Sequence, residues 1–122
     1  MNLGTHCGDD PFAVRSNRAR LRAILPGEPV WLDQVHGVDV LDADATQGVC
    51  AGGGAVARAD AAISAQVGRP LVIMTADCLP VLFCDLDGTV VGAAHAGWRG
   101  LAACVLERTL DALRVRAPHA SQ

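Results

Sequence analysis

The chain has 122 residues, of which 51% are hydrophobic and 19% are charged, and thirteen acidic residues against ten arginines give a formal net charge of −3. The hydrophobic content excludes an intrinsically disordered chain, the lack of a three- or seven-residue repeat excludes a collagen or coiled-coil rod, and the length suits one domain. A mildly acidic chain without a basic stripe lacks the phosphate contacts that dominate nucleic-acid affinity, so no nucleic-acid partner is expected.

The first half of the chain is predicted to contain one helix and two short strands. Asp10 favours the start of a helix over residues 11–25, because aspartate caps free N–H groups and the proline that follows suits the first helical position. Strands are expected at residues 30–32 and 38–41, followed by a mobile, Ala- and Gly-rich loop over residues 42–59. The apolar stripe of the helix would consist of Val14, Leu21, Ile24 and Leu25.

A buried strand is predicted next. Residues 71–75 form a continuous apolar run rich in β-branched side chains, as expected for a strand that is buried on both faces. Pro80 would interrupt this strand, because proline cannot donate a hydrogen bond to a central ladder. The chain would then resume as a strand over residues 81–85.

A hairpin and a helix are predicted to follow. Asp87 and Gly88 favour a two-residue turn, since glycine accepts the positive φ that such turns need, and residues 89–94 would form the returning strand. A helix is expected over residues 101–113. Its buried side would consist of Ala102, Val105, Leu106, Thr109, Leu110 and Leu113.

The sequence also indicates where the protein resides. The most apolar stretch, residues 71–83, contains Asp77 and is too short to cross a bilayer, so no membrane contact is expected. The first residues lack the basic and apolar regions of a secretory signal. Five irregularly spaced cysteines indicate reduced thiols rather than a disulfide framework. We therefore expect a cytoplasmic protein.

Three side chains that can bind a metal stand at ends or interruptions of the predicted strands: His36, Cys78 and His95. Their separations of 42 and 17 residues match no local zinc motif, so only the fold could bring them together. Two imidazoles and one thiolate would leave a zinc ion an open position for water or substrate. The residue types leave a second interpretation open, because a lone cysteine is more often a small buried hydrophobe, as expected for Cys84 and Cys104.

Three charged residues are candidates for supporting roles. Arg99 stands just before the predicted helix, where free N–H groups favour anions, and could bind phosphate; the alternative is a solvated arginine stacked on Trp98. Asp60 and Asp77 could each orient a metal-binding imidazole. Alternatively, Asp60 is a helix-cap or turn residue, and Asp77 accepts hydrogen bonds from N–H groups of its own loop.

Three motifs, taken in order, resemble a known family. They are residues 34–37 (QVHG), 75–80 (TADCLP) and 94–100 (AHAGWRG), and together they are similar to the YfiH-type proteins, also called DUF152 or laccase-domain proteins. The two longer motifs are specific, whereas the four-residue motif is short. The resemblance extends from about residue 2 to about residue 113.

The resemblance implies a fold, a cofactor and an activity. The fold would be α+β, a mixed β-sheet with flanking helices similar to the catalytic domain of cytotoxic necrotizing factor. His36, Cys78 and His95 would bind a zinc ion and form the catalytic site. The substrates would be phosphate and the purine nucleosides adenosine, inosine and 5′-methylthioadenosine, with deamination of adenosine as a further activity. Older descriptions of the family as copper-dependent polyphenol oxidases make Cu²⁺ the alternative cofactor.

Members of this family are longer than the present chain. Residues 1–122 are therefore expected to form a single partial domain, with an incomplete fold that lacks N-terminal and C-terminal parts. Two other interpretations stay open. One is a metal-free hydrolase with Cys78 as nucleophile and His95 as base; the other is an inactive metal-binding fragment.

Overall fold

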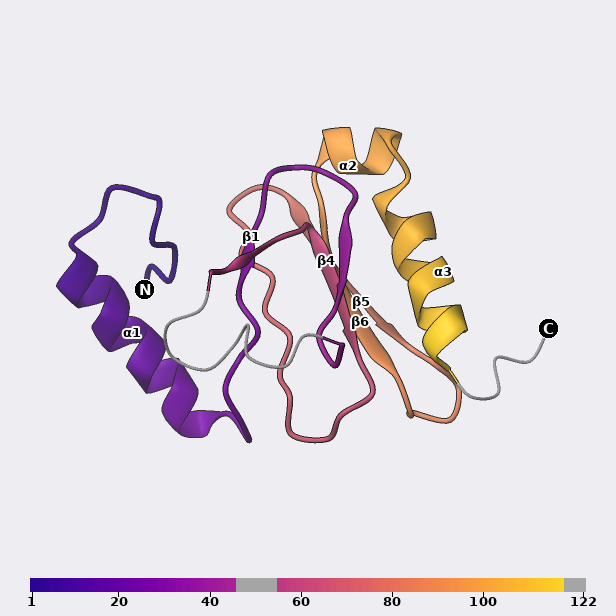
Figure 1. Cartoon of the computed structure of the whole chain (residues 1–122). Helices are drawn as coiled ribbons and strands as arrows, with labels where there is room; N and C mark the ends of the chain where they lie inside the picture. The colour runs from indigo at the N-terminus through magenta and orange to yellow at the C-terminus, as the bar shows by residue number, and fades with distance from the viewer. Residues whose placement is uncertain (46–54, 118–122) are drawn as a thin grey trace.

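A mixed four-stranded sheet with one helix packed along its face forms the centre of the protein in the computed structural model, which describes residues 1–45 and 55–117 (Figure 1). The middle strands pair antiparallel, and the first two strands in the order pair parallel, which makes the sheet mixed. The predicted α+β class is thereby confirmed. The strands, in spatial order, are β2 (Val40–Asp42), β4 (Ala61–Ser64), β6 (Val91–Ala96) and β5 (Leu79–Cys84).

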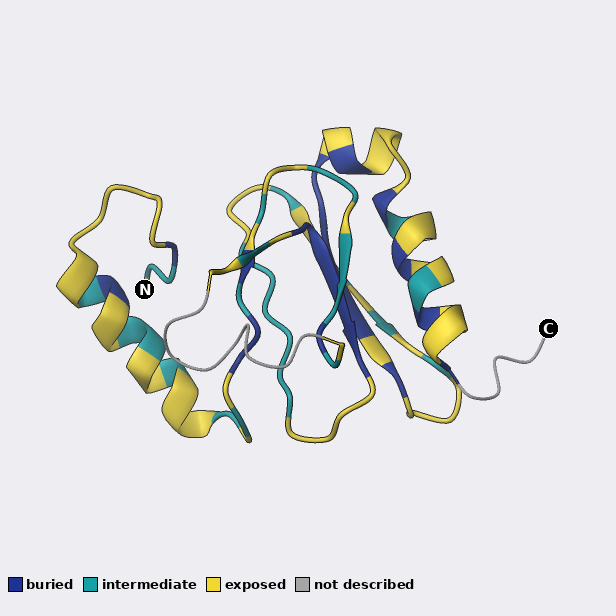
Figure 2. Ribbon diagram, in the orientation of Figure 1, coloured by how far each residue is buried: buried dark blue, intermediate teal, exposed yellow. Residues whose placement is uncertain are grey.

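The core is built on small residues of the two middle strands. Helix α3 (Val105–Arg116) packs on one face, where Val105 contacts Ala61 and Ala94. The opposite face is covered by residues 30–32 and 71–73. Figure 2 shows β4 and most of β6 as the buried centre between these layers. The sequence patterns do not predict β4, because alanine has little intrinsic preference for strands and this strand depends on its neighbours.

Helix α1 (Pro11–Ile24) confirms the predicted start of the first helix. The Asp10 carboxylate accepts the N–H of Phe12 at 3.0 Å, and a proline occupies the first helical position. The predicted apolar stripe is wrong at its end, because Ile24 is 81% exposed and only Val14 is fully buried. In Figure 1 the sheet lies between α1 and α3.

The segment over residues 71–75 is not the predicted strand. Only one isolated bridge forms, between Val30 and Leu71, and the side chains of this segment are half-buried or exposed. The Val72 N–H still donates to the Val30 carbonyl at 3.2 Å, but no strand among residues 1–45 and 55–117 continues the ladder. An apolar, β-branched run favours a strand only where the fold supplies a partner.

Strand β5 includes the proline that was expected to interrupt it. Pro80 pairs with His95 in register. β5 is an edge strand of the sheet, and an edge strand tolerates a residue without an N–H group. The hairpin turn is also longer than predicted: the Asp85 N–H donates to the Val90 carbonyl at 3.1 Å, which leaves four residues in the loop. Gly88 lies in this loop with φ +66°, as its position in a turn predicts.

The helix predicted over residues 101–113 is divided in two. Helix α2 (Trp98–Ala102) ends before Cys104, which has a left-handed φ of 70°, and α3 begins directly afterwards. Cys84 and Cys104 are both exposed, so the prediction that they are buried thiols is wrong. Val105, Thr109 and Leu113 are buried as predicted, whereas Ala102 and Leu110 are exposed. Ala102 ends α2, before the helix break, and Leu110 lies on the outer side of α3.

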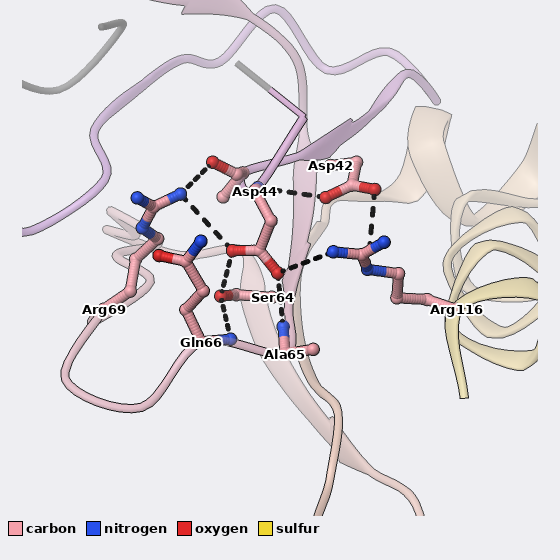
Figure 3. Close-up of polar contacts among 8 residues, drawn as sticks. Asp42, Asp44, Ser64, Ala65, Gln66, Arg69 and Arg116 are labelled. Carbon is pink, nitrogen blue, oxygen red and sulfur yellow. Dashed lines mark hydrogen bonds and ion pairs between the residues drawn. The ribbon is translucent and has the colours of Figure 1, made fainter. Parts of the chain in front are cut away.

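A polar cluster ties the end of α3 to the sheet (Figure 3). The Asp44 carboxylate, with a side chain only 1% exposed, accepts hydrogen bonds from Ser64 Oγ at 2.7 Å, the Ala65 N–H at 2.6 Å and Arg116 Nη2 at 3.4 Å. Arg69 Nη1 lies 3.3 Å from the same carboxylate. Burial raises the pKa of Asp44, but these hydrogen bonds and the charge of Arg69 outweigh it and hold the pKa below its usual value.

The segment predicted as a loop contains a short strand. β3 (Ala57–Arg58) pairs in parallel with β1 (Leu32–Asp33) to form a separate two-stranded sheet. Residues 46–54, including the glycine run of the predicted mobile loop, lie outside the described residues. In the part of the chain that the structure describes, no helix combines the length and apolarity needed to cross a membrane.

Candidate metal centre

The fold brings His36, Cys78 and His95 together. Each offers one ligand atom, and these three atoms lie within 4.8 Å of one another. The Cys78 Sγ is 3.8 Å from His36 Nε2, and the two imidazole rings meet edge to face with 4.8 Å between their centroids. Residues separated by 42 and 17 positions therefore share one site, with His95 buried, Cys78 half-buried and His36 exposed.

Each ligand comes from a different local structure. His36 lies in the loop after β1 with a φ of 59°, a left-handed conformation that is uncommon for a residue with a side chain. Cys78 lies at the end of the bend over residues 76–78, immediately before β5. His95 lies near the end of β6, where its own N–H donates to the carbonyl of Asp60 at 2.7 Å. The site therefore forms where a loop, a bend and a strand end meet.

One buried carboxylate holds the two histidines. Asp60 is completely buried, and its Oδ1 accepts a hydrogen bond from Nδ1 of His95 at 2.9 Å. The same carboxylate accepts the backbone N–H groups of Val35, His36 and Gly37 at 2.7–3.1 Å, which holds the loop in its left-handed turn. A carboxylate partner assigns the proton of His95 to Nδ1 and leaves Nε2 with a free lone pair for a metal.

The Asp60 carboxylate is ionised at neutral pH. Burial raises its pKa, but the hydrogen bond from His95 and those from the N–H groups of residues 35–37 more than offset this and lower the pKa below its usual value. An ionised, fully hydrogen-bonded carboxylate is the state in which Asp60 can orient both histidine-bearing segments.

Gly97 lies directly against two of the candidate ligands. A Cβ atom at this position would be 3.0 Å from Cys78 Sγ and 3.1 Å from His36 Cδ2. The φ of Gly97 is −77°, which any residue can adopt, so glycine is required here by space and not by backbone conformation. The structure therefore shows a close approach of the backbone to the candidate ligands at this position.

A cavity of about 480 Å³ opens beside the three ligands. This volume lies within the range of pockets that bind small molecules. The N-terminal segment forms one wall and the segment that leads to Cys78 forms another. The lining residues are Met1, Asn2, Leu3, Gly4, His6, Cys7, Gln34, His36, Val72, Ile73, Met74, Thr75, Ala76, Asp77, Cys78 and His95.

Two of the candidate supporting residues lie further from the ligands. Asp77 is exposed and lines the cavity, but within residues 1–45 and 55–117 its carboxylate makes no hydrogen bond to an imidazole. Arg99 is exposed on α2, with its guanidinium carbon 5.1 Å from the centroid of the Trp98 ring. This is the stacked arrangement that stood as the alternative for Arg99. The phosphate role of Arg99 and the orienting role of Asp77 stay predictions.

Gln34, part of the short motif over residues 34–37, makes a contact that its sequence neighbourhood does not reveal. Its Nε2 donates to the Met74 carbonyl and its Oε1 accepts the Met74 N–H, both at 2.8 Å. These residues are 40 positions apart, so no local pattern predicts the contact.

The ligand set fits a transition metal. Two imidazoles and a thiolate are donors that zinc and copper both accept. Bonds of about 2.0–2.3 Å in a tetrahedral arrangement place donor atoms roughly 3.5 Å apart. The observed separation of 3.8 Å between Cys78 Sγ and His36 Nε2 is close to this value, and the 4.8 Å limit for all three atoms leaves only a small side-chain adjustment.

Comparison with known proteins gives consistent matches. The family described as "Multi-copper polyphenol oxidoreductase laccase" matches residues 1–122. The chain is 58% identical to a purine nucleoside phosphorylase of Pseudomonas aeruginosa over 115 residues, 94% of this chain and 44% of that protein. It is 55% identical to the purine nucleoside phosphorylase YfiH of Escherichia coli over 113 residues, 91% of this chain and 44% of that protein.

Solved structures agree with these matches. The structure of a Neisseria meningitidis protein of the DUF152 family is similar with a TM-score of 0.82 and 46% identity, covering 93% of this chain and 44% of that one. The structure of YlmD from Geobacillus stearothermophilus is similar with a TM-score of 0.80 and 34% identity, covering 94% and 45%. The chain thus spans less than half the length of these relatives.

Proposed function

The chain belongs to the multi-copper polyphenol oxidoreductase laccase family, and from that premise we propose that it is part of a zinc-dependent purine nucleoside phosphorylase. The observation that carries the proposal is the convergence of His36, Cys78 and His95 within 4.8 Å beside a cavity of about 480 Å³. The names of the relatives, at 58% and 55% identity, support the reaction class.

The proposed reaction exchanges one bond at the ribose. A phosphate oxygen forms a bond to C1′ while the glycosidic bond breaks, and the purine leaves with the bonding electrons and takes up a proton, giving ribose 1-phosphate and the free base. A zinc ion at this site would supply a Lewis acid that polarises an oxygen or nitrogen ligand. The cavity would hold the nucleoside beside His36 and Cys78. We assign polarisation or protonation of the departing purine to His36, Cys78 and His95.

Three side chains would support this reaction without taking part in bond exchange. Asp60 keeps Nδ1 of His95 protonated, so that Nε2 points its lone pair at the site. Arg99 is proposed to position phosphate, because Gly97, two residues before it, contacts the ligand set. Asp77, which lines the cavity, is proposed to orient a ligand or the substrate when the cavity is filled.

Deamination of adenosine is the second activity we propose for the same site. Zinc deaminases attack C6 of adenine with a water molecule that the metal activates, and the donor set here suits that chemistry. Inosine and 5′-methylthioadenosine are proposed as further substrates of the phosphorylase. Because the matched relatives are more than twice as long as the match, we also propose that residues 1–122 are a partial domain and that turnover depends on the remainder.

Phenol oxidation with copper is the alternative, favoured by the description of the family. A thiolate with two imidazoles also suits copper. Metal analysis of the purified chain and oxygen consumption with a phenol distinguish the two proposals: copper content with oxygen uptake supports the oxidase, and zinc content without uptake supports the phosphorylase. Alkylation by iodoacetamide that a chelator does not change would instead support a metal-free Cys78 nucleophile.

The direct test is turnover of adenosine with phosphate, followed by chromatography of adenine, inosine and ribose 1-phosphate. Because turnover is proposed to depend on the remainder of the protein, the assay uses an assembly that shows turnover with the wild-type sequence, and the Pseudomonas aeruginosa relative is the positive control. The Cys78→Ala variant is expected to lose all three products. Cys84→Ala, at an exposed cysteine on β5, is the matched control and should retain them. Turnover that survives Cys78→Ala would rule out the proposed site.

A further inference from the structure

Next to the candidate metal centre, the Gln34 side chain makes the backbone hydrogen bonds to Met74 that a neighbouring β-strand would otherwise make. Its amide both donates to and accepts from the peptide of Met74, and both hydrogen bonds are 2.8 Å long. This is the pairing that a neighbouring strand would offer, but it is made by a side chain. We call this pair of hydrogen bonds the Gln34–Met74 clamp.

The clamp holds a segment that little else fixes. The last backbone bond before it joins the Val72 N–H to the Val30 carbonyl, and the ladder of β5 begins only where Leu79 pairs with Ala96. Among residues 1–45 and 55–117, the other hydrogen bonds to the intervening segment are two long sulfur contacts. One joins Arg18 to the Met74 sulfur at 4.0 Å, and the other joins Cys78 Sγ to His36 Nε2 at 3.8 Å. The backbone that carries Cys78 is therefore positioned mainly by the clamp.

The three candidate ligands differ in how they are held. Asp60 binds Nδ1 of His95 and the N–H of His36, so one carboxylate fixes both histidines relative to each other. Cys78 makes no hydrogen bond to this carboxylate in the described residues, and its closest polar contact is the 3.8 Å approach to His36 Nε2. Gln34 lies two residues before His36, and Met74 lies four before Cys78, so the clamp joins the two loops at their bases.

We infer that Gln34 is a positioning residue that sets the Cys78 thiol against the two histidines. The inference rests on the proposed metal site and deepens it. Without the clamp, the backbone of residues 73–78 has no hydrogen-bond partner among the described residues. The thiolate then spends less time within bonding range of a metal that the histidines hold. The expected consequence is weaker metal binding, because the two histidines remain in place while the Cys78 thiolate does not.

The test compares two Gln34 variants with matched controls. Gln34→Glu keeps the shape but places an oxygen acceptor against the Met74 carbonyl, and Gln34→Ala removes both bonds. Gln66→Glu and Gln66→Ala are the controls, because the Gln66 side chain is exposed. Zinc affinity is measured by competition with a chromogenic chelator, and Co²⁺ is added separately to record the thiolate-to-cobalt charge-transfer band.

Both Gln34 variants are expected to bind zinc about 10- to 100-fold more weakly, the usual loss when a residue that supports a metal ligand is removed. The cobalt band should weaken in the same variants, because it reports the thiolate alone, and both Gln66 variants should match the wild type. Zinc affinity within twofold of wild type, in a Gln34 variant with an unchanged circular dichroism spectrum, would overturn the inference.

Hydrogen exchange keeps the inference testable if a variant fails to fold or the chain binds no metal. The Met74 amide is expected to exchange slowly in the metal-free wild type, and fast exchange there would overturn the clamp directly. Normal zinc affinity and a normal cobalt band in the wild type, without nucleoside turnover in an assembly that contains the remainder of the protein, would contradict the proposed function and leave the role of Gln34 intact. The two failures are therefore distinguishable.

Discussion

The buried carboxylate of Asp60 accepts a hydrogen bond from Nδ1 of His95 at 2.9 Å, and the backbone of His95 in turn donates to the carbonyl of Asp60 at 2.7 Å. Two residues 35 positions apart thus hold each other through both side chain and backbone. Because the same carboxylate also accepts three N–H groups of the loop around His36, the geometry of the metal site depends on one acidic group.

Replacing this acidic group should damage both stability and metal binding. Asp60→Asn cannot accept all four hydrogen bonds, and each buried donor left unpaired costs about 1–3 kcal/mol. We expect the free energy of unfolding to fall by about 2 kcal/mol or more and zinc affinity to fall about 10- to 100-fold. Urea unfolding and chelator competition measure the two effects. Asp87→Asn in the exposed hairpin loop is the control, and equal behaviour of both variants would contradict the role of Asp60.

The free energy of unfolding should decrease as the pH is lowered, because Asp44 becomes protonated. This residue lies away from the metal site. Because its pKa is lower in the folded protein than in the unfolded chain, Asp44 contributes stability that is fully present above the unfolded pKa of about 4 and is lost as the pH falls through the folded pKa. The difference in free energy of unfolding between wild type and Asp44→Asn is therefore expected to shrink from pH 7 to pH 3. Asp111→Asn, at an exposed pair with Arg114, is the control. A constant difference for Asp44→Asn would contradict the prediction.

Adding one methyl group at Gly97 should disturb the site. The new Cβ would be 3.0 Å from Cys78 Sγ, so the thiol must move. We expect zinc affinity to fall about tenfold, similar to the loss of a residue that orients a ligand, with no change in secondary structure by circular dichroism. Gly92→Ala, on β6, meets its neighbours at 3.4 Å or more and serves as the control. Equal zinc affinity in the two alanine variants would show that Gly97 does not limit the site.

Zinc should stabilise the chain, and its removal should reverse the effect. At a free zinc concentration about 100 times the Kd, the free energy of unfolding should rise by about 2.7 kcal/mol. Thermal unfolding with zinc and then with excess chelator measures this change. Cys78→Ala should lose most of the stabilisation, whereas Cys84→Ala should retain it because Cys84 lies outside the site. Zinc stabilisation of equal size in both variants would exclude Cys78 as a ligand.

Arg99 provides a test of phosphate binding. If its guanidinium positions phosphate, Arg99→Ala raises the KM for phosphate about tenfold, a loss of about 1.4 kcal/mol, without changing the KM for adenosine. Steady-state kinetics with each substrate varied in turn, performed on an assembly that shows turnover, measures both constants. Arg108→Ala, another exposed arginine, is the control. An unchanged KM for phosphate in Arg99→Ala would leave Arg99 as the stacking partner of Trp98 alone.

Local patterns predicted several features of this protein correctly. The cap at Asp10, the positive φ of Gly88 and the buried positions Val105, Thr109 and Leu113 of α3 depend on residues within a few positions of one another, and the structure confirms them. The family resemblance is confirmed by the family match over residues 1–122. It could be recognised from sequence alone because its motifs are contiguous stretches. The three candidate ligands can be identified from the sequence, because their side chains can bind a metal and they stand at the ends or interruptions of predicted strands.

Only the tertiary structure decided how these pieces meet. The strand predicted over residues 71–75 lacks a partner, and the alanine-rich β4 becomes central because neighbours pair with both of its edges. The contact between Gln34 and Met74, 40 positions apart, likewise depends on the tertiary fold. It exists because the fold places a side-chain amide where a neighbouring strand would lie. Side-chain chemistry and short-range backbone preferences are properties of the sequence itself, whereas hydrogen-bond partners and ligand distances between remote segments depend on how the whole chain packs.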